Sequence, residues 1–159
     1  MYTIKLVQES DIYILSEIFS KSFSEADKEK PWDKAHAEKY LLYWLAKQPD
    51  MFFGAYDEND KPVGAIAVNI KPWRTDVRCS DGVVFVDVEH QKQGIAKSLF
   101  EKVIKEAMNK YNAKSFEAIT FAGEEFPLTW YKRIGINPDE HAALIKGNCE
   151  DILNKLSKE

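Results

Sequence analysis

The spacing of apolar and polar residues predicts strands alternating with helices. Residues 2–6 alternate between the two classes, as a half-buried strand does. Residues 82–88 form a nearly continuous apolar run, which predicts a buried central strand. We assign further strands to residues 51–56, 63–70 and 115–121, the first two joined by a turn at residues 58–60. The chain is therefore rich in short strands from its beginning to residue 121.

Helical periodicity separates these strands. In residues 92–110, apolar residues recur every three or four positions, which predicts a long amphipathic helix. Helices are also expected after Ser10 or Asp11, after Asp33, over residues 126–133 and after Asn148, since each start has a capping residue or an early proline. Residues 22–32 and 71–79 are assigned to loops, and residues 142–145 to an edge strand. The order predicts a mixed α/β sheet with helices on both faces.

The turn between residues 82–88 and the long helix has the most informative composition. It reads Gln-Lys-Gln-Gly-Ile-Ala over residues 91–96. The first N–H groups of a helix lack intrahelical partners, and the helix dipole adds positive charge, so phosphate binds readily there. Gly94 lets the backbone approach an oxyanion, while Lys92 and Lys97 add charge. The alternative interpretation is an ordinary strand-to-helix connection that happens to contain one glycine.

Two better-known phosphate motifs fit this chain less well. A P-loop requires Gly-x-x-x-x-Gly-Lys-Ser/Thr, which does not occur in the sequence. The dinucleotide fingerprint requires Gly-x-Gly-x-x-Gly after an early strand, whereas here Gly94 stands alone and past the middle of the chain.

Two segments resemble one known family. Val86-x-Val88-x-x-Gln91-x-x-Gly94-x-Ala96 resembles the acetyl-CoA signature of the GNAT-type N-acetyltransferases, Gln/Arg-x-x-Gly-x-Gly/Ala. Further along, residues 130–136 resemble the Leu-Tyr-x-x-x-Gly-Phe segment of the same family, with Tyr131 at the tyrosine. The resemblance implies a mostly antiparallel central sheet in which strands 82–88 and 115–121 splay apart to admit the acyl-CoA arm.

The resemblance also implies a cosubstrate, acetyl-CoA, and roles for particular residues, with no metal. Backbone amides of Val84 or Val86 would donate to the developing oxyanion, and Tyr131 would protonate the leaving thiolate. The turn would hold the diphosphate, and the strand would pair with the pantetheine arm. The residues expected to bind acetyl-CoA are Val86, Val88, Gln91, Lys92, Gln93, Gly94, Ile95, Ala96, Lys97 and Ser98.

The chain departs from the family pattern before Tyr131. Many members carry Asn and Ala seven and four residues before the tyrosine, where this chain has Glu124 and Pro127. Since that Asn often contacts the pantetheine arm, the departure leaves a non-catalytic acyl-CoA-binding or sensor protein as the alternative to an enzyme. A third reading is a different α/β domain that binds an anionic partner at the turn.

Several acidic residues could act as the general base, judged from the sequence alone. An alkylammonium must lose a proton before it attacks a thioester. Asp81, at the start of the central strand, is the candidate that we favour among the acids, followed by Asp87, Glu124 and Glu125. Deprotonation through water, without a dedicated base, is an equal alternative.

The acceptor is expected to be a primary amine of a small molecule or peptide. Residues 22–35 and 71–80 would build its pocket, with Phe23, Trp32, Trp73 and Tyr40 as an aromatic wall. The alternative is that these rings only pack between helices.

The composition of the chain narrows the classes of protein and of ligand that remain. The 159 residues predict one domain over 1–159, and a net charge of −4 without a basic block argues against nucleic acid as a ligand. The two cysteines and three histidines match no metal-site spacing. No secretory signal or membrane-length apolar run is visible, so we expect a cytoplasmic protein. Dimers are frequent in the family, and a homodimer is a further expectation.

Overall fold

The computed structural model describes residues 2–26, 31–120 and 125–157. The chain divides into two compact units, Met1–Ala118 and Ile119–Glu159. The first unit holds a five-stranded sheet in the order β1-β2-β3-β4-β5, in which β4 and β5 pair in parallel and the other pairs are antiparallel. Its strands are β1 (Thr3–Leu6), β2 (Phe52–Tyr56), β3 (Pro62–Trp73), β4 (Asp76–Val86) and β5 (Ser115–Phe116). The expected mixed, mostly antiparallel sheet is confirmed.

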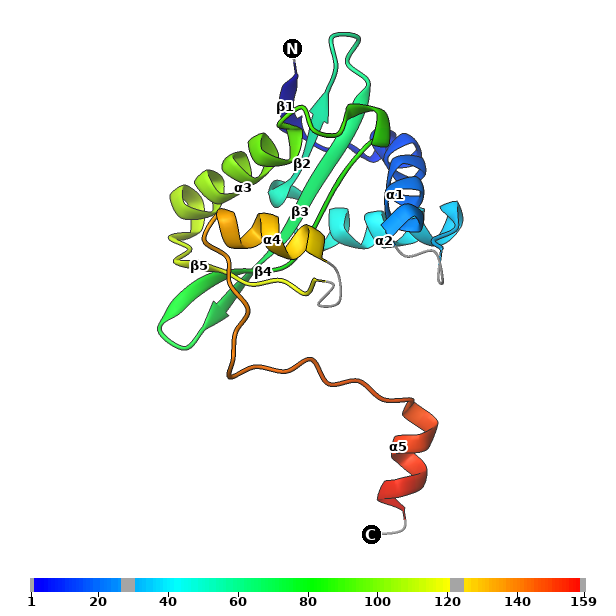
Figure 1. The fold of residues 1–159 in the computed structure, drawn as a ribbon, viewed down its shortest axis with the longest axis vertical. Coiled ribbons are helices and arrows are strands. Elements are labelled where there is room, and N and C mark those ends of the chain that lie inside the picture. Colours follow the sequence, from blue (N-terminus) through cyan, green and yellow to red (C-terminus); the bar gives the residue numbers. More distant parts are fainter. Residues whose placement is uncertain (1, 27–30, 121–124, 158–159) are drawn as a thin grey trace. The chain divides into compact units, whose positions relative to one another are not determined.

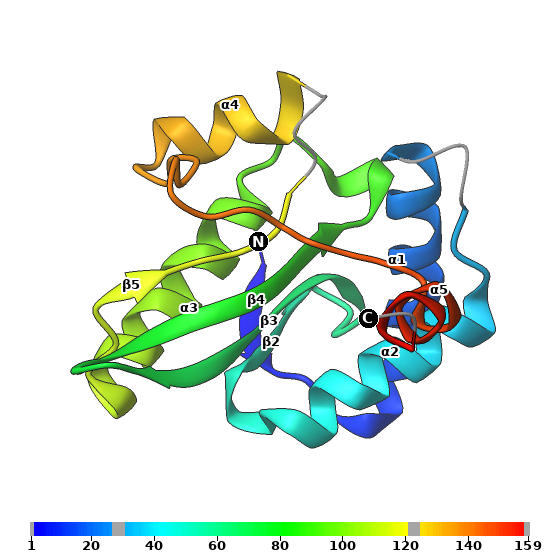
Figure 2. The same ribbon diagram turned by 90° about the horizontal axis from the view of Figure 1, so that it is seen from below.

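Helices cover both faces of this sheet, as Figures 1 and 2 show. Helices α1 (Ile12–Ala26) and α2 (Lys34–Lys47) pack on one face, and α3 (Ile95–Tyr111) packs on the other. Side chains alternate between faces along a strand. Val83 and Phe85 of β4 accordingly join the α1–α2 core, together with Phe19 and Leu41. Val84 and Val86 therefore point toward the face that α3 covers.

The core under α3 gives a direct test of this packing. Leu99 is 0 % exposed, whereas Met108 on the same helix is 58 % exposed. We expect Leu99→Ala to lower the free energy of unfolding by about 2–5 kcal/mol, because it removes buried methyl groups and leaves a cavity. Met108→Ala, the control, should change it by less than about 0.5 kcal/mol. Urea unfolding measures both, and equal losses in the two variants would contradict the packing.

The capping predictions for two helices are confirmed. The Asp33 carboxylate accepts a hydrogen bond from the His36 N–H at 3.1 Å at the start of α2. Asn148 accepts from the N–H of Glu150 at 2.9 Å and begins α5 (Cys149–Leu156) in the second unit. The start of α1 differs, since a 3₁₀ helix over Glu9–Asp11 precedes it. Asp11 there accepts the Gln8 N–H and the Tyr56 hydroxyl instead of capping α1 directly.

Several expected boundaries are wrong. Residues 71–79 are not a loop, because β3 and β4 continue to a hairpin tip at residues 73–76, where Lys71 and Arg78 lie over the Trp73 ring. Helix α1 runs on to Ala26 in place of a loop from residue 22. The central strand ends at Val86. Of the strand expected over residues 115–121, β5 covers residues 115–116, residues 117–120 form no strand, and residue 121 lies outside the described residues. In each case, contacts distant in sequence decide where the element begins or ends.

In the described residues of the second unit there are two helices, α4 (Glu125–Arg133) and α5. Within residues 125–157 no strand forms, so the edge strand expected at residues 142–145 is wrong. Leu144 and Ile145 are exposed there and find no neighbouring strand to pair with. In the part of the chain that the structure describes, none of the helices combines the length and apolar character that crossing a bilayer requires.

A candidate anion-binding turn beside a free strand edge

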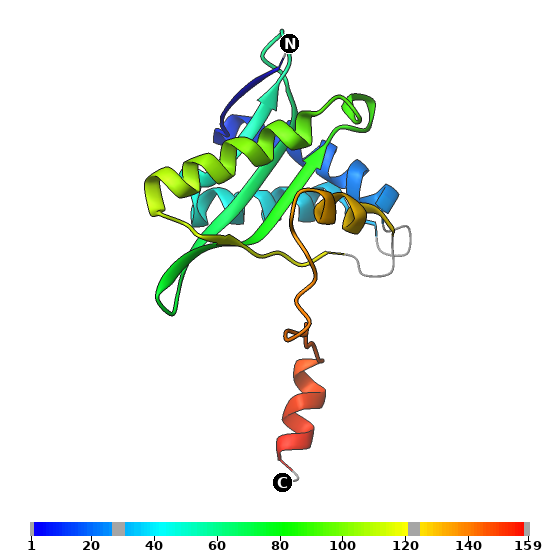
Figure 3. The ribbon, with the colours of Figure 1, turned by 60° about the vertical axis from the view of Figure 1, so that its left-hand side comes forward.

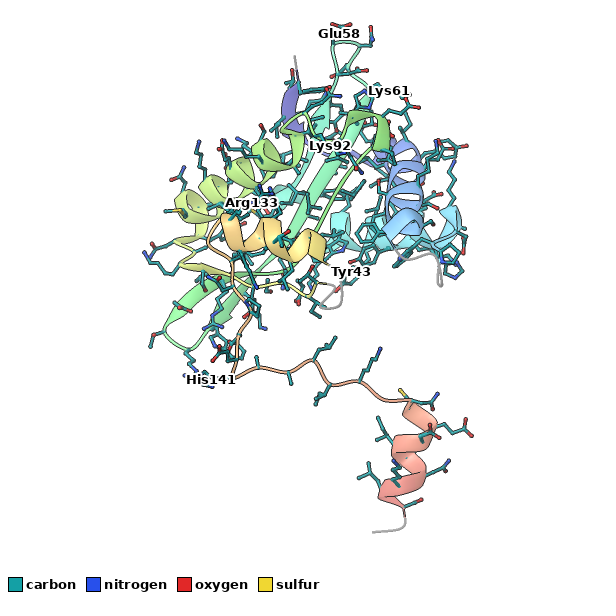
Figure 4. The ribbon with its side chains drawn as sticks, in the orientation of Figure 1. Tyr43, Glu58, Lys61, Lys92, Arg133 and His141 are labelled. Carbon is teal, nitrogen blue, oxygen red and sulfur yellow. The ribbon has the colours of Figure 1, made fainter. Side chains whose placement is uncertain are left out.

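The turn before α3 has an unusual backbone. After β4, a 3₁₀ helix spans Val88–His90, and α3 then begins at Ile95. Lys92 and Gly94 both have left-handed backbone angles, with φ of 62° and 82°. Residues of alternating handedness turn successive N–H groups toward one centre and create a concavity for an anion. Lys92 stands in this turn in Figure 4.

The amides of this turn are available to a ligand. Within the described chain, the N–H groups of residues 92–97 donate to no protein acceptor. The first N–H of the helix that bonds is that of Ser98, to the Gly94 carbonyl at 3.0 Å. A Cβ placed on Gly94 would meet nothing within 4 Å, so the space beside the turn is open. These unpaired donors and the helix dipole favour an anionic group.

Side chains on both sides fix the turn to the sheet. The Gln91 side-chain amide donates to the Val86 carbonyl at 3.2 Å, and the Ser22 hydroxyl of α1 donates to the same oxygen at 2.9 Å. His90 Nδ1 lies 3.1 Å from the Asp87 carboxylate. Val88, expected on the strand, lies in the 3₁₀ helix, because the Asp87 carbonyl accepts the His90 N–H and turns the chain. Ser22 carried no sequence signal for this role.

One edge of β4 is free next to the turn. The Asp87 N–H bonds to the Val63 carbonyl of β3 at 2.8 Å. Alternate residues of an antiparallel strand bond to the same neighbour, so Val83 and Phe85 bond to β3 while Val84 and Val86 direct their N–H groups away from it. On that side, β5 pairs with β4 only as far as Phe116, and the Glu117 N–H to Cys79 carbonyl bond follows. Past that point, no described strand covers β4.

Asp81 lies where this free edge begins. The register between β3 and β4 shifts between Ala67 and Asn69, which places a bulge at residues 81–82. Asp81 has a left-handed φ of 55°, a conformation that costs a non-glycine residue about 1–2 kcal/mol. Its exposed carboxylate accepts a long bond of 3.4 Å from the buried Ser80 hydroxyl. Bulges commonly redirect side chains next to functional sites.

The aromatic residues expected around the acceptor separate into two places. Phe23 stacks on Phe19 with ring centroids 4.4 Å apart, and Trp32 meets Phe19 edge-on at 5.0 Å, both on the α1–α2 face. Burial raises the pKa of the neighbouring Tyr40 phenol, and the charge of Asp81 adds to this shift. Trp73, by contrast, lies at the β3–β4 hairpin tip, which extends away from these helices in Figures 1 and 3.

Tyr131 lies on α4 in the second unit, with its ring 5.3 Å from that of Trp130. The side chain is half-buried, and burial raises the pKa of its phenol above the ordinary value. The hydroxyl therefore carries its proton throughout the neutral range. Of the other acids considered, Glu125 is the first residue of α4, and Glu124 lies outside the described residues.

Of the remaining reactive side chains, His36 and His90 have local partners, Cys79 is buried, and Cys149 is a free, exposed thiol. Among the residues that the structure describes, no three His, Cys, Asp or Glu side chains gather closely enough to hold a metal ion. His36 contacts Asp33, and His90 contacts Asp87. Burial raises the pKa of the Cys79 thiol to about 11, so its thiolate is scarce near neutral pH.

The mixed sheet, the turn with unpaired backbone amides and the adjacent free edge of β4 define an α/β protein with a candidate anion-binding site. Residues 12–136 match the acetyltransferase (GNAT) family, and the chain belongs to this family. The family assignment rests on a match over most of the chain, and it includes both the turn and the segment around Tyr131.

Individual relatives agree with this assignment. An uncharacterized N-acetyltransferase of Methanocaldococcus jannaschii is 27% identical over 150 residues, which cover 92% of this chain and 64% of that protein. A predicted acetyltransferase of Clostridium acetobutylicum solved with acetyl-CoA superposes with a TM-score of 0.70 at 15% identity, over 92% of this chain and 96% of that one. A ribosomal-protein-alanine N-acetyltransferase of Brucella melitensis superposes with a TM-score of 0.71 at 18% identity, over 93% of this chain and 100% of that one. The last two share the fold.

Proposed function

We propose that the protein transfers an acetyl group from acetyl-CoA to a primary amine of a small molecule or peptide, by direct attack of the amine on the thioester. The observation that carries this proposal is the row of free amides at residues 92–97 next to the free edge of β4. Family membership and a structural neighbour solved with acetyl-CoA support it.

The residues present fit this cosubstrate. The open space beside Gly94 and the unpaired N–H groups suit a diphosphate, and Lys92 adds charge in the turn. The Val84 N–H and carbonyl suit the amide groups of a pantetheine arm, which would lie along β4 like an added strand. Ser22 and Gln91 fix the Val86 carbonyl, so the strand edge and the turn keep one geometry.

Acetyl-CoA supplies an activated acetyl thioester. The N–H of Val84 or Val86 would donate to the carbonyl oxygen as negative charge develops on it. As the amine nitrogen bonds to the acetyl carbon and the carbon–sulfur bond breaks, Tyr131 would give its proton to the departing sulfur. Positioning of the two reactants supplies much of the remaining acceleration.

The ammonium form of the acceptor can lose its proton in two ways, to Asp81 or to water. Asp81 is exposed, lies at the start of the free edge and contributes negative charge near Tyr40, so it suits both attraction and deprotonation of an ammonium. Release through water is the alternative. Phe23 and Trp32, which pack against the α1–α2 core, are the aromatic residues that we favour for the acceptor pocket, and Trp73 on the hairpin tip is the weaker candidate.

Thermal unfolding tests the cosubstrate. A ligand that binds only the folded state stabilises it by mass action, so acetyl-CoA at a hundredfold excess over its Kd should raise the Tm by roughly 5–10 °C. Inorganic phosphate at the same concentration should leave the Tm unchanged. Absence of a shift at millimolar acetyl-CoA would exclude the proposal.

A second experiment separates an enzyme from a sensor. Glu124, which stands where many relatives have Asn, is the observation that favours a binding protein without activity. Thiol release should be followed with a panel of primary amines. Amine-dependent release identifies the enzyme, and tight binding of acetyl-CoA without release across the panel identifies the sensor.

A further inference from the structure

The segment that opens the first strand reaches the anion-binding turn. The Tyr2 hydroxyl donates a hydrogen bond to the Gln93 side-chain oxygen at 2.6 Å, although the two residues are 91 positions apart. Thr3, the next residue, pairs with Tyr56 in the sheet. Tyr2 is therefore anchored to the sheet on one side and bonded to the turn on the other. Helix α3 also contacts β1.

The Gln93 side chain is held at both of its polar atoms. Its oxygen accepts from Tyr2, and its nitrogen donates to the Glu89 carbonyl at 3.4 Å. The Tyr2 ring also meets the His90 ring edge-on, with centroids 6.3 Å apart. Tyr2 thus contacts the turn and the 3₁₀ helix together.

Gln93 stands between the two left-handed residues, Lys92 and Gly94. Its neighbouring peptide planes carry N–H groups of the anion site, and left-handed backbone at Lys92 is a conformation that must be maintained by its surroundings. A side chain fixed at both ends restricts the rotation of those planes. A site that is already ordered loses less entropy when its ligand binds.

We propose that Tyr2 is a positioning residue for the cosubstrate: through Gln93, it holds the turn amides in the geometry that binds the diphosphate of coenzyme A. This inference rests on the proposed function. It applies to the diphosphate alone, since the Tyr2 and Gln93 contacts lie at the turn and not along β4.

The decisive variant is Tyr2→Phe, which removes the hydroxyl and keeps the ring. Calorimetric titration should show the Kd for acetyl-CoA rising roughly threefold to tenfold, the loss expected for one well-formed hydrogen bond. The Kd for S-acetylpantetheine, which lacks the diphosphate, should stay unchanged. A simple loss of structure would weaken both ligands together, so the pair of ligands separates positioning from folding.

Tyr43→Phe is the matched control. Tyr43 lies on α2, away from the turn, as Figure 4 shows, and its hydroxyl accepts a hydrogen bond from Lys47 at 2.9 Å. The same chemical change there should leave both affinities alone. In a Gln93→Met background, Tyr2→Phe should have no further effect, because the two changes remove the same interaction.

Each possible result decides for or against the positioning role of Tyr2. An unchanged acetyl-CoA affinity in Tyr2→Phe, equal weakening of both ligands, or full additivity with Gln93→Met would overturn the inference and leave the proposed function intact. Failure of the wild-type protein to bind acetyl-CoA would remove both. If Tyr2→Phe unfolds, the effect of Gln93→Met alone on the two ligands gives the same decision.

Discussion

Substituting Gly94 by valine should reduce the affinity for acetyl-CoA at least about thirtyfold, since two effects add. A β-branched residue is strained at a φ of 82°, so the turn shifts. The new side chain also enters the open space beside the amides, where no protein atom lies within 4 Å of the Cβ position and where the diphosphate is expected. Titration of the purified variant with acetyl-CoA measures the loss.

The variant Asn112→Val tests how much of the Gly94→Val effect comes from backbone strain and how much from obstruction of the diphosphate site. Asn112 ends the same helix, also in the left-handed region, with a φ of 54°. Valine there should lower the Tm as Gly94→Val does, and should leave the acetyl-CoA affinity near that of the wild type. If Gly94→Val binds acetyl-CoA tightly, the diphosphate does not rest on this turn.

Tyr131→Phe should lower kcat by about a hundredfold or more while changing the acetyl-CoA affinity little, because general acid catalysis typically contributes 10²–10⁴ in rate. The substitution removes only the phenolic hydroxyl, and the ring that packs beside Trp130 remains. Steady-state thiol release measures the effect once an active amine is in hand. Trp130→Phe, which alters the neighbouring ring and keeps the phenol, is the control and should retain most of the rate.

The pH profile gives an independent readout for Tyr131. Burial raises the pKa of its phenol, so the protonated form persists beyond the ordinary phenol value of about 10. The wild-type rate should therefore show no Tyr131-dependent decline below that pH. A wild-type decline near neutral pH that vanishes in Tyr131→Phe would contradict the assignment of a protonated acid.

The strand-to-helix turn could be predicted because its determinants are local. The apolar run of residues 82–88, the glycine of the turn at position 94 and the helical spacing from Ile95 all lie within one segment. The left-handed backbone of Lys92 could not be predicted, since lysine has no preference for that region and the conformation depends on its neighbours.

Contacts between distant residues were beyond sequence analysis. The Ser22 bond to Val86 joins residues 64 positions apart, and the Tyr2 bond to Gln93 joins residues 91 apart. Neither serine nor tyrosine follows a spacing that marks such a partner. The hairpin tip was assigned to a loop for a related reason, because the charged residues that pack on Trp73 reduce the strand signal of residues 71–79.

The bulge at Asp81 and the 3₁₀ helix at Val88 together limit the uncovered stretch of β4 to residues 82–86. Exposed strand edges recruit other polypeptides when they are long and flat. A segment bounded by a bulge at one end and a 3₁₀ helix at the other offers too little straight backbone for a strand of another protein to pair with it. The shortness of this edge therefore disfavours aggregation through strand pairing, while a narrow molecule with two amide groups, such as the proposed pantetheine arm, needs no longer edge.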